Sequence, residues 1–133
     1  MNHRATVSLT IGLFASAAGS SANAHHGYSQ YDRCQRLSIA GEIEQISWAN
    51  PHIVVTLKGD DAVAYRVEWI SLQQLQRSGL ASGILEVGDR VVVTGSKNRD
   101  PERVILTLLK AIDRPADGWH WSRSYDSCTE ASR

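Results

Sequence analysis

The chain has 133 residues, and its fourteen Lys and Arg side chains are balanced by fourteen Asp and Glu side chains. A formal charge of zero argues against a nucleic-acid partner, because binding to a phosphate backbone needs a cationic excess. The length fits one small domain, and two cysteines without zinc-finger spacing argue against a zinc site.

Residues 1–24 have the pattern of a cleavable secretory signal. Arg4 gives a cationic start, an apolar stretch follows, and the segment ends in Ala22-Asn23-Ala24. An uncleaved anchor fits less well, because the apolar stretch is short and interrupted by polar residues. We therefore expect an exported protein, periplasmic or extracellular, without a membrane span after processing. Removal of Arg4 would leave thirteen cations against fourteen acids, a formal charge of −1.

Both cysteines lie in the exported portion, near its two ends. In an oxidising compartment we expect Cys34 and Cys128 to pair. The disulfide would close a loop of about 95 residues, which stabilises the folded chain by about 4 kcal/mol in the chain-entropy model. The alternative, a redox-active pair, lacks the C-x-x-C spacing.

Alternating apolar residues predict five strands and one short helix. Residues 25–36 are polar and aromatic without a clear period, which indicates an irregular N-terminal arm, and Lys97 to Pro101 reads as a polar loop. The expected elements are strands at about 37–48, 52–58 and 62–69, a helix at 71–79, strands at about 90–95 and 103–112, and a C-terminal tail at 113–133.

Local signals refine these elements. Gly41 and a change of register near Gln45 predict a bulge that bends the first strand. Pro51 belongs in the connection to the second strand, because proline cannot donate to a central ladder. Ser71 can cap the helix and Gly79 can end it.

Three strands, a short helix and two further strands form the order of an OB fold, a small five-stranded Greek-key barrel. We therefore predict an all-β, OB-like barrel at 37–112. An SH3-like barrel and a small sandwich are the alternatives at this length. No internal repeat or linker divides the chain, so one domain is expected.

Three motifs resemble those of a known family. They are Ala24-His25-His26, Asn50-Pro51-His52 and the segment 85–95, which contains Gly-Asp-Arg-Val-Val-Val-Thr-Gly. The chain thus resembles a family of small exported bacterial proteins of unknown function that read Ala-His-His-Ser-Phe, Thr-Asn-Pro-His and Gly-Asp-x-Val-x-Val-x-Gly. The resemblance extends to about Ile112 and implies a fold and a compartment, but no activity.

Cleavage after Ala24 would place His25 at the amino terminus, where its amine and ring nitrogen can chelate a metal together. His26 adds a further nitrogen, and His52 or His120 could supply another. Imidazole suits copper, so we predict a copper site as one hypothesis. A cut after Ala22 would still place a histidine third, an arrangement that binds Cu(II). The alternative is that these histidines are ordinary solvated polar residues.

A second hypothesis is a binding surface on the middle strands and flanking loops of the barrel. Trp48, Tyr65 and Trp69 offer aromatic faces for a sugar or peptide, and Lys97 and Arg99 lie on the last inter-strand loop. The alternative is that at least two of these aromatic residues form the core, because the exported portion has no phenylalanine to fill a barrel.

Trp119 and Trp121 either cover one open end of the barrel or mark a partner contact. No nucleophile elbow, phosphate-binding glycine loop or metalloprotease helix is present in the sequence, so we do not expect an enzyme. The sequence therefore predicts a non-catalytic binding or accessory module for an unknown protein, glycan or small molecule. The alternative is a periplasmic copper-binding or copper-delivery protein that uses the processed N-terminal histidines.

Overall fold

The computed structural model describes residues 28–123 and 128. The described part is mostly strand, with one short α-helix and one turn of 3-10 helix, which confirms the predicted all-β class. No helix in this part has the length and hydropathy needed to cross a bilayer. In chain order the elements are η1 Tyr28–Gln30, β1 Tyr31–Ser47, β2 Val54–Gly59, β3 Ala64–Glu68, α1 Leu72–Arg77, β4 Arg90–Asn98, β5 Ile105–Arg114 and β6 Trp119–Ser122.

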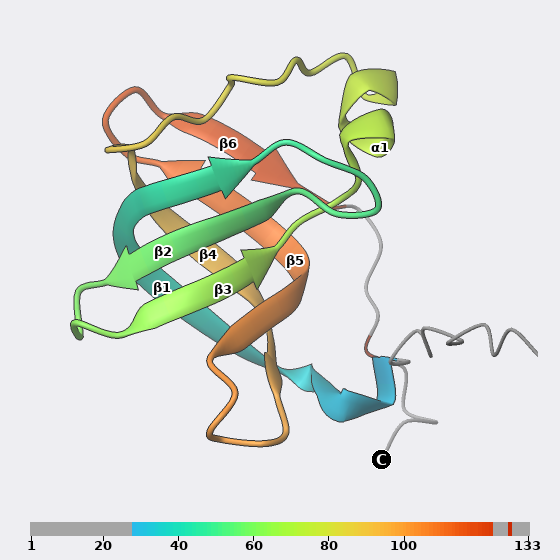
Figure 1. The fold of residues 1–133 in the computed structure, drawn as a ribbon, viewed down its shortest axis with the longest axis vertical. Coiled ribbons are helices and arrows are strands. Elements are labelled where there is room, and N and C mark those ends of the chain that lie inside the picture. The colour runs from blue at the N-terminus through green and yellow to red at the C-terminus, as the bar shows by residue number, and fades with distance from the viewer. Residues whose placement is uncertain (1–27, 124–127, 129–133) are drawn as a thin grey trace, which may run out of the picture.

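Five ladders close the sheet into a barrel (Figure 1). β1 pairs antiparallel with β2 and β4, β2 with β3, and β4 with β5. The circle closes between β3 and β5, which run parallel. This connectivity, with α1 between β3 and β4, is that of the predicted OB fold. β6 is an addition to it and pairs with the second half of β5.

β1 bends, and it pairs with β4 along its first part and with β2 along its second part. Its register against β2 shifts between Ile43 and Gln45, as the sequence predicts. Gly41 faces Gly59 on one side and Val91 on the other. A Cβ at Gly41 would collide with the carbonyl group of Lys58, so only glycine permits this close approach of β1 and β2.

The helix follows its sequence signals. The Ser71 hydroxyl accepts a hydrogen bond from the Gln74 N–H, and the Gln74 side chain accepts one from the Ser71 N–H. These two bonds form a capping box. Gly79 has a φ of 81°, a left-handed conformation that glycine adopts readily after a helix end.

Three stretches of strand differ from the sequence prediction. β1 begins at Tyr31, inside the segment predicted to be an irregular arm, and β4 continues to Asn98, into the predicted loop. Tyr31 pairs with Asn98 there, and much of the stretch is exposed, so backbone pairing holds it without an alternating apolar pattern. β6 lies in the predicted tail and, at four residues, is too short to show a period.

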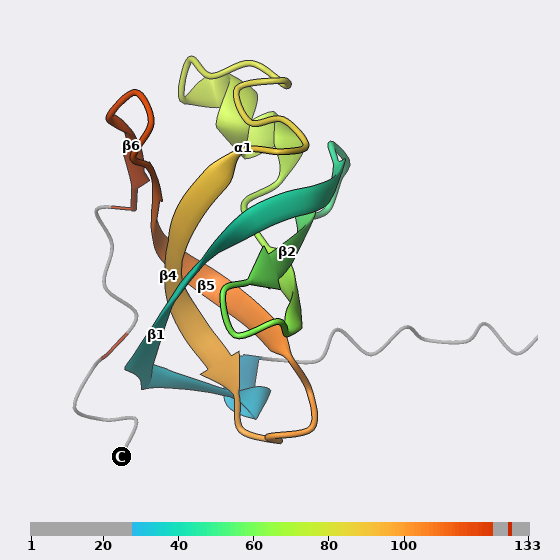
Figure 2. The same ribbon diagram turned by 90° about the vertical axis from the view of Figure 1, so that its left-hand side faces the viewer.

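The two ends of the barrel differ in composition. α1 and β6 lie at one end, which we call the tryptophan end after Trp48, Trp69, Trp119 and Trp121. The β4–β5 loop, residues 99–104, and the start of β1 lie at the other end, which we call the loop end (Figures 1 and 2). Between them lies one core of buried side chains: Ile39, Ile43, Ile53, Val55, Leu57, Val67, Trp69, Ile70, Leu75, Leu85, Val91, Val93, Leu106, Leu109 and Ile112.

Candidate functional site

The loop end contains a hollow of about 180 Å³ lined by six apolar and four polar residues, which we call the apolar hollow. β1, β3, the loop and the start of β5 all contribute to it. Val104 is one of two large hydrophobic residues with a well exposed side chain among the described residues. The apolar residues that line the hollow are Leu37, Tyr65, Pro101, Val104, Ile105 and Leu106, and the polar ones are Lys97, Asn98, Asp100 and Arg103.

A second hollow of about 280 Å³ adjoins the first, and we call it the polar hollow. Gln30 and Arg99 line the polar hollow but not the apolar one. Asn98, Asp100 and Arg103 line both hollows and therefore form the boundary between them. The loop end thus places an apolar space directly beside a polar one.

Hydrogen bonds within the loop hold this arrangement. The Asn98 Oδ1 atom accepts from the Asp100 N–H at 2.9 Å, and the Asp100 Oδ1 atom accepts from the Glu102 N–H at 3.0 Å. The Arg99 N–H donates to the Gln30 carbonyl at 2.8 Å, which ties the loop to η1. Side chains that hydrogen-bond to their own backbone stabilise a specific loop conformation, so the hollows exist before any ligand arrives.

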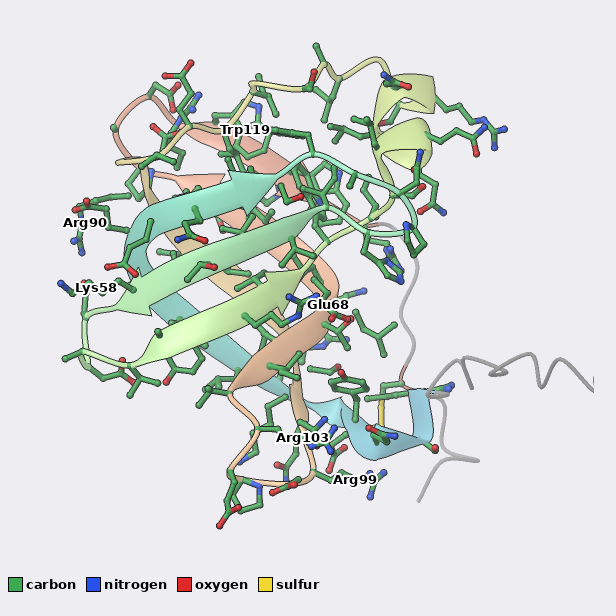
Figure 3. All side chains as sticks on the ribbon, viewed as in Figure 1. Lys58, Glu68, Arg90, Arg99, Arg103 and Trp119 are labelled. Atoms are coloured by element: carbon green, nitrogen blue, oxygen red, sulfur yellow. A yellow bond between two sulfur atoms is a disulfide. The ribbon has the colours of Figure 1, made fainter. Side chains whose placement is uncertain are left out.

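Positive charge dominates this lining. Lys97, Arg99 and Arg103 face a single lining carboxylate, that of Asp100. Asp100 lies 3.5 Å from the Arg103 Nε atom, so it already has a cationic partner. The side chains of Lys97 and Arg99 have no acidic partner among the described residues. Figure 3 shows Arg99 and Arg103 together at this end, away from Lys58 and Arg90.

Tyr31 lies next to two residues of the boundary between the hollows, Asn98 and Arg103. Burial raises the pKa of the Tyr31 hydroxyl and the charge of Glu68 adds to this effect, whereas Asn98, Arg103 and Arg66 act in the opposite direction. Tyr31 therefore stays neutral and lies close to the Asn98 and Arg103 side chains. The Asn98 Nδ2 atom is buried, and the hydrogen bond from this side chain toward the Tyr31 hydroxyl acts to lower the pKa of Tyr31.

Tyr65 presents its ring rather than its hydroxyl to the apolar hollow. The hydroxyl donates a 2.6 Å hydrogen bond to Asp61, which raises the pKa of Tyr65 and lowers that of Asp61. Of the predicted aromatic surface, Tyr65 thus reaches the same site as Lys97, and Arg99 lies next to it.

Trp48 and Trp69 lie at the tryptophan end instead. Trp69 is 3% exposed, and its ring centroid lies 6.3 Å from that of Trp48 and 5.2 Å from that of Trp121. Trp119 and Trp121 are half-buried and pack against the core from β6, as the cover interpretation predicts. The predicted binding surface is therefore divided between the two ends of the barrel.

The two histidines that the structure describes, His52 and His120, have different partners. His25 and His26 lie outside the described residues. The His52 Nδ1 atom is 3.3 Å from the Trp69 carbonyl oxygen, which can only accept, and the His120 Nδ1 atom is 2.6 Å from Asp113. His52 lines a smaller hollow of about 100 Å³ between β3 and β5. Within residues 28–123 and 128, no three His, Cys, Asp or Glu side chains group as metal ligands.

The disulfide joins Cys34 and Cys128, as predicted, across a sequence separation of 94 residues. It ties the C-terminal segment to the first part of β1. That part of β1 pairs with the end of β4, where the loop of the candidate site begins.

The sequence model of a family of unknown function, DUF6152, matches residues 13–107, more than half of the chain. The chain belongs to this family. This agrees with the resemblance to a family of unknown function, although the roles of the Ala-His-His and Asn-Pro-His motifs stay a prediction. The segment that matches DUF6152 contains every residue that lines the apolar and polar hollows and ends before β6. No curated protein matches the chain.

For this DUF6152 chain, sequence reasoning missed Leu37, Asn98, Arg103 and Val104 as residues of the loop end. The strand predicted at 103–112 included Val104, whereas β5 begins at Ile105 and Val104 lies in the loop before it. The Asn98-Arg99-Asp100-Pro101 run indicates a turn, because Asn and Asp side chains bond to the backbone two residues on.

Proposed function

We propose that this chain is an exported, non-catalytic binding module that takes a small ligand at the loop end. One observation carries the proposal: an apolar hollow and a polar hollow share a wall, in a loop that its own hydrogen bonds hold in place. Ligand sites typically combine apolar lining with a few convergent polar groups. Export is supported by the signal pattern of residues 1–24 and by the paired cysteines.

The proposal is tested by native mass spectrometry of the protein purified, without detergent, from the compartment to which it is exported. We expect a non-covalent adduct of low mass on the native chain. The test variant is Val104→Gln, which removes apolar lining and partly fills the hollow without changing charge. Val87→Gln is the matched control, because Val87 is also an exposed valine and lies outside both hollows.

The adduct should be lost or strongly reduced in Val104→Gln and retained in Val87→Gln. An adduct that both variants retain equally would place the ligand elsewhere on the molecule. The absence of any adduct on the native chain would contradict the proposal.

Copper binding by the processed end is a second proposal, supported by His25 and His26 directly after the expected cleavage site. The test is retention of one equivalent of Cu(II) against a competing chelator. Retention should be lost when His25 and His26 are both replaced by glutamine, and kept when His120, which pairs with Asp113, is replaced in the same way. Retention by the first variant would exclude the processed end as the site.

A further inference from the structure

The two hollows of the loop end differ in the chemistry that they offer. The apolar hollow is lined by aliphatic side chains of Leu37, Val104 and Ile105 and by the Tyr65 ring. The polar hollow has no apolar lining residue and includes Arg99 and Arg103. The aliphatic and aromatic residues lie in the first hollow and Arg99 in the second, so the pair suits a molecule that has both an apolar part and a polar part.

The charges of the lining decide the sign of the polar part. Three cations and one carboxylate line the two hollows, and that carboxylate pairs with Arg103. Two cations, Lys97 and Arg99, then have no acidic partner in the described part of the chain. Lys97 lines the apolar hollow and Arg99 the polar one, so an anion at the shared boundary would be attracted by both cations.

Asn98 supports the wall between the hollows from the inside. It is 3% exposed, its Nδ2 atom is buried behind the lining, and a hydrogen bond from this side chain acts to lower the pKa of Tyr31. The lining groups that can face a ligand are therefore the two cations without an acidic partner among the described residues, Lys97 and Arg99, and they favour an acceptor-rich group.

We infer that the ligand of the loop end is a small amphipathic anion, with a short apolar body in the apolar hollow and one anionic group beside Lys97 and Arg99. This inference rests on the proposed function and names the chemical class of its ligand. The anionic group can be a carboxylate, sulfate or phosphate, because all three accept charge-assisted hydrogen bonds from Lys and Arg. The volume of about 180 Å³ limits the apolar body to a short chain or a single ring.

Isothermal titration calorimetry on the full exported chain tests the inference, with three probes that share one octyl chain. n-Octyl sulfate carries a negative head group, n-octyl glucoside a neutral one and n-octyltrimethylammonium a positive one. Each is used below its micelle concentration and at low ionic strength, because salt screens exposed charges. Octyl sulfate should bind most tightly and octyltrimethylammonium most weakly.

The test variant is the double substitution Lys97→Gln and Arg99→Gln. The matched control is Lys58→Gln with Arg77→Gln, which removes the same charge from exposed sites on β2 and α1, outside both hollows. We expect octyl sulfate to bind about tenfold more weakly to the test variant. The control should change this affinity less than about twofold, by loss of long-range attraction only.

Each contrary outcome has a distinct meaning. If octyl glucoside binds as tightly as octyl sulfate and Val104→Gln weakens both, the loop end binds ligands but does not select anions, so this inference fails and the proposed function stands. If Val104→Gln leaves octyl sulfate binding unchanged, the probe binds elsewhere and both fail for this ligand class. Equal affinity for octyl sulfate in the test and control variants, or no binding of octyl sulfate, overturns the inference.

Discussion

The two ends of this barrel are held together in different ways. The tryptophan end is closed by large side chains, with Trp69 between Trp48 and Trp121 and with Leu75 of α1 fully buried. The loop end is held by hydrogen bonds that the Asn98 and Asp100 side chains accept from backbone N–H groups of their own loop. The side chains of the tryptophan end are buried against one another, whereas side chains that line the loop end can still contact a ligand.

An ion cluster reinforces the closed end. Arg114 bonds to the Asp89 and Asp117 carboxylates, both at 2.8 Å, and to the Ile84 carbonyl at 2.9 Å, while its guanidinium group lies 5.6 Å from the Trp119 ring centroid. These contacts join the loop before β4 to the turn between β5 and β6. Substitutions at the tryptophan end should therefore change stability, and substitutions at the loop end should change binding.

The largest effect is expected at Trp69. Trp69→Ala should lower the free energy of unfolding by about 4 kcal/mol, because it leaves a cavity among buried rings. Trp69→Phe should cost much less, since a ring remains and the buried indole N–H, which has no partner in the described residues, is removed. Urea denaturation followed by circular dichroism measures both. A loss below about 1 kcal/mol for Trp69→Ala would show that this end is not held by packing.

Removal of the disulfide should have the next largest effect. Cys34→Ser with Cys128→Ser should lower the free energy of unfolding by about 3–4 kcal/mol, because the crosslink closes a loop with a sequence separation of 94 residues. Hydrogen exchange should quicken first in residues 31–36 of β1 and in their partners on β4, beside the loop end. If exchange quickens instead around β6 and α1, the crosslink supports the tryptophan end.

The smallest effect is expected at Asp117. Its hydrogen bonds from Arg114 hold the pKa of this carboxyl below its ordinary value of 3.8. The stability that Asp117 contributes is therefore fully present above pH 3.8, and it is lost as pH falls through the lower folded-state pKa. Asp117→Asn should thus be less stable than the native chain at neutral pH, and the difference should shrink in acid. Thermal melts of both proteins over a range of pH values test this. A stability difference between them that does not change with pH would show that the charge of Asp117 does not contribute.

The same comparison explains what the sequence could predict. Local signals were reliable where one residue type is required, as at Gly41, where two strands approach closely, and at Ser71, which caps α1. Alternation predicted one strand at 62–69 that contains both Tyr65 and Trp69, and β3 covers Ala64–Glu68 of this segment. Four residues of strand span about 13 Å, however, so the two rings lie toward different ends of the barrel. Periodicity gives the face of a strand but not which distant segments meet there.

The loop end was harder to predict for a related reason. Asn98, Arg103 and Val104 come together through hydrogen bonds specific to one loop conformation, which leave no apolar period in the sequence. The first part of β1 and all of β6 depend on pairing with a strand far away in the chain. The disulfide was predictable because the sequence has only two cysteines and both follow the segment 1–24, which has the pattern of a secretory signal.

The most direct test of the division between the two ends is a titration of the ¹⁵N-labelled chain with n-octyl sulfate, followed by nuclear magnetic resonance. The four tryptophan indole N–H signals report on the tryptophan end, and the backbone amides of 97–106, with those of Leu37 and Tyr65, report on the loop end. We expect saturable shifts of the loop-end amides while the indole signals stay in place. Shifts of the indole signals with an unchanged loop end would contradict the account.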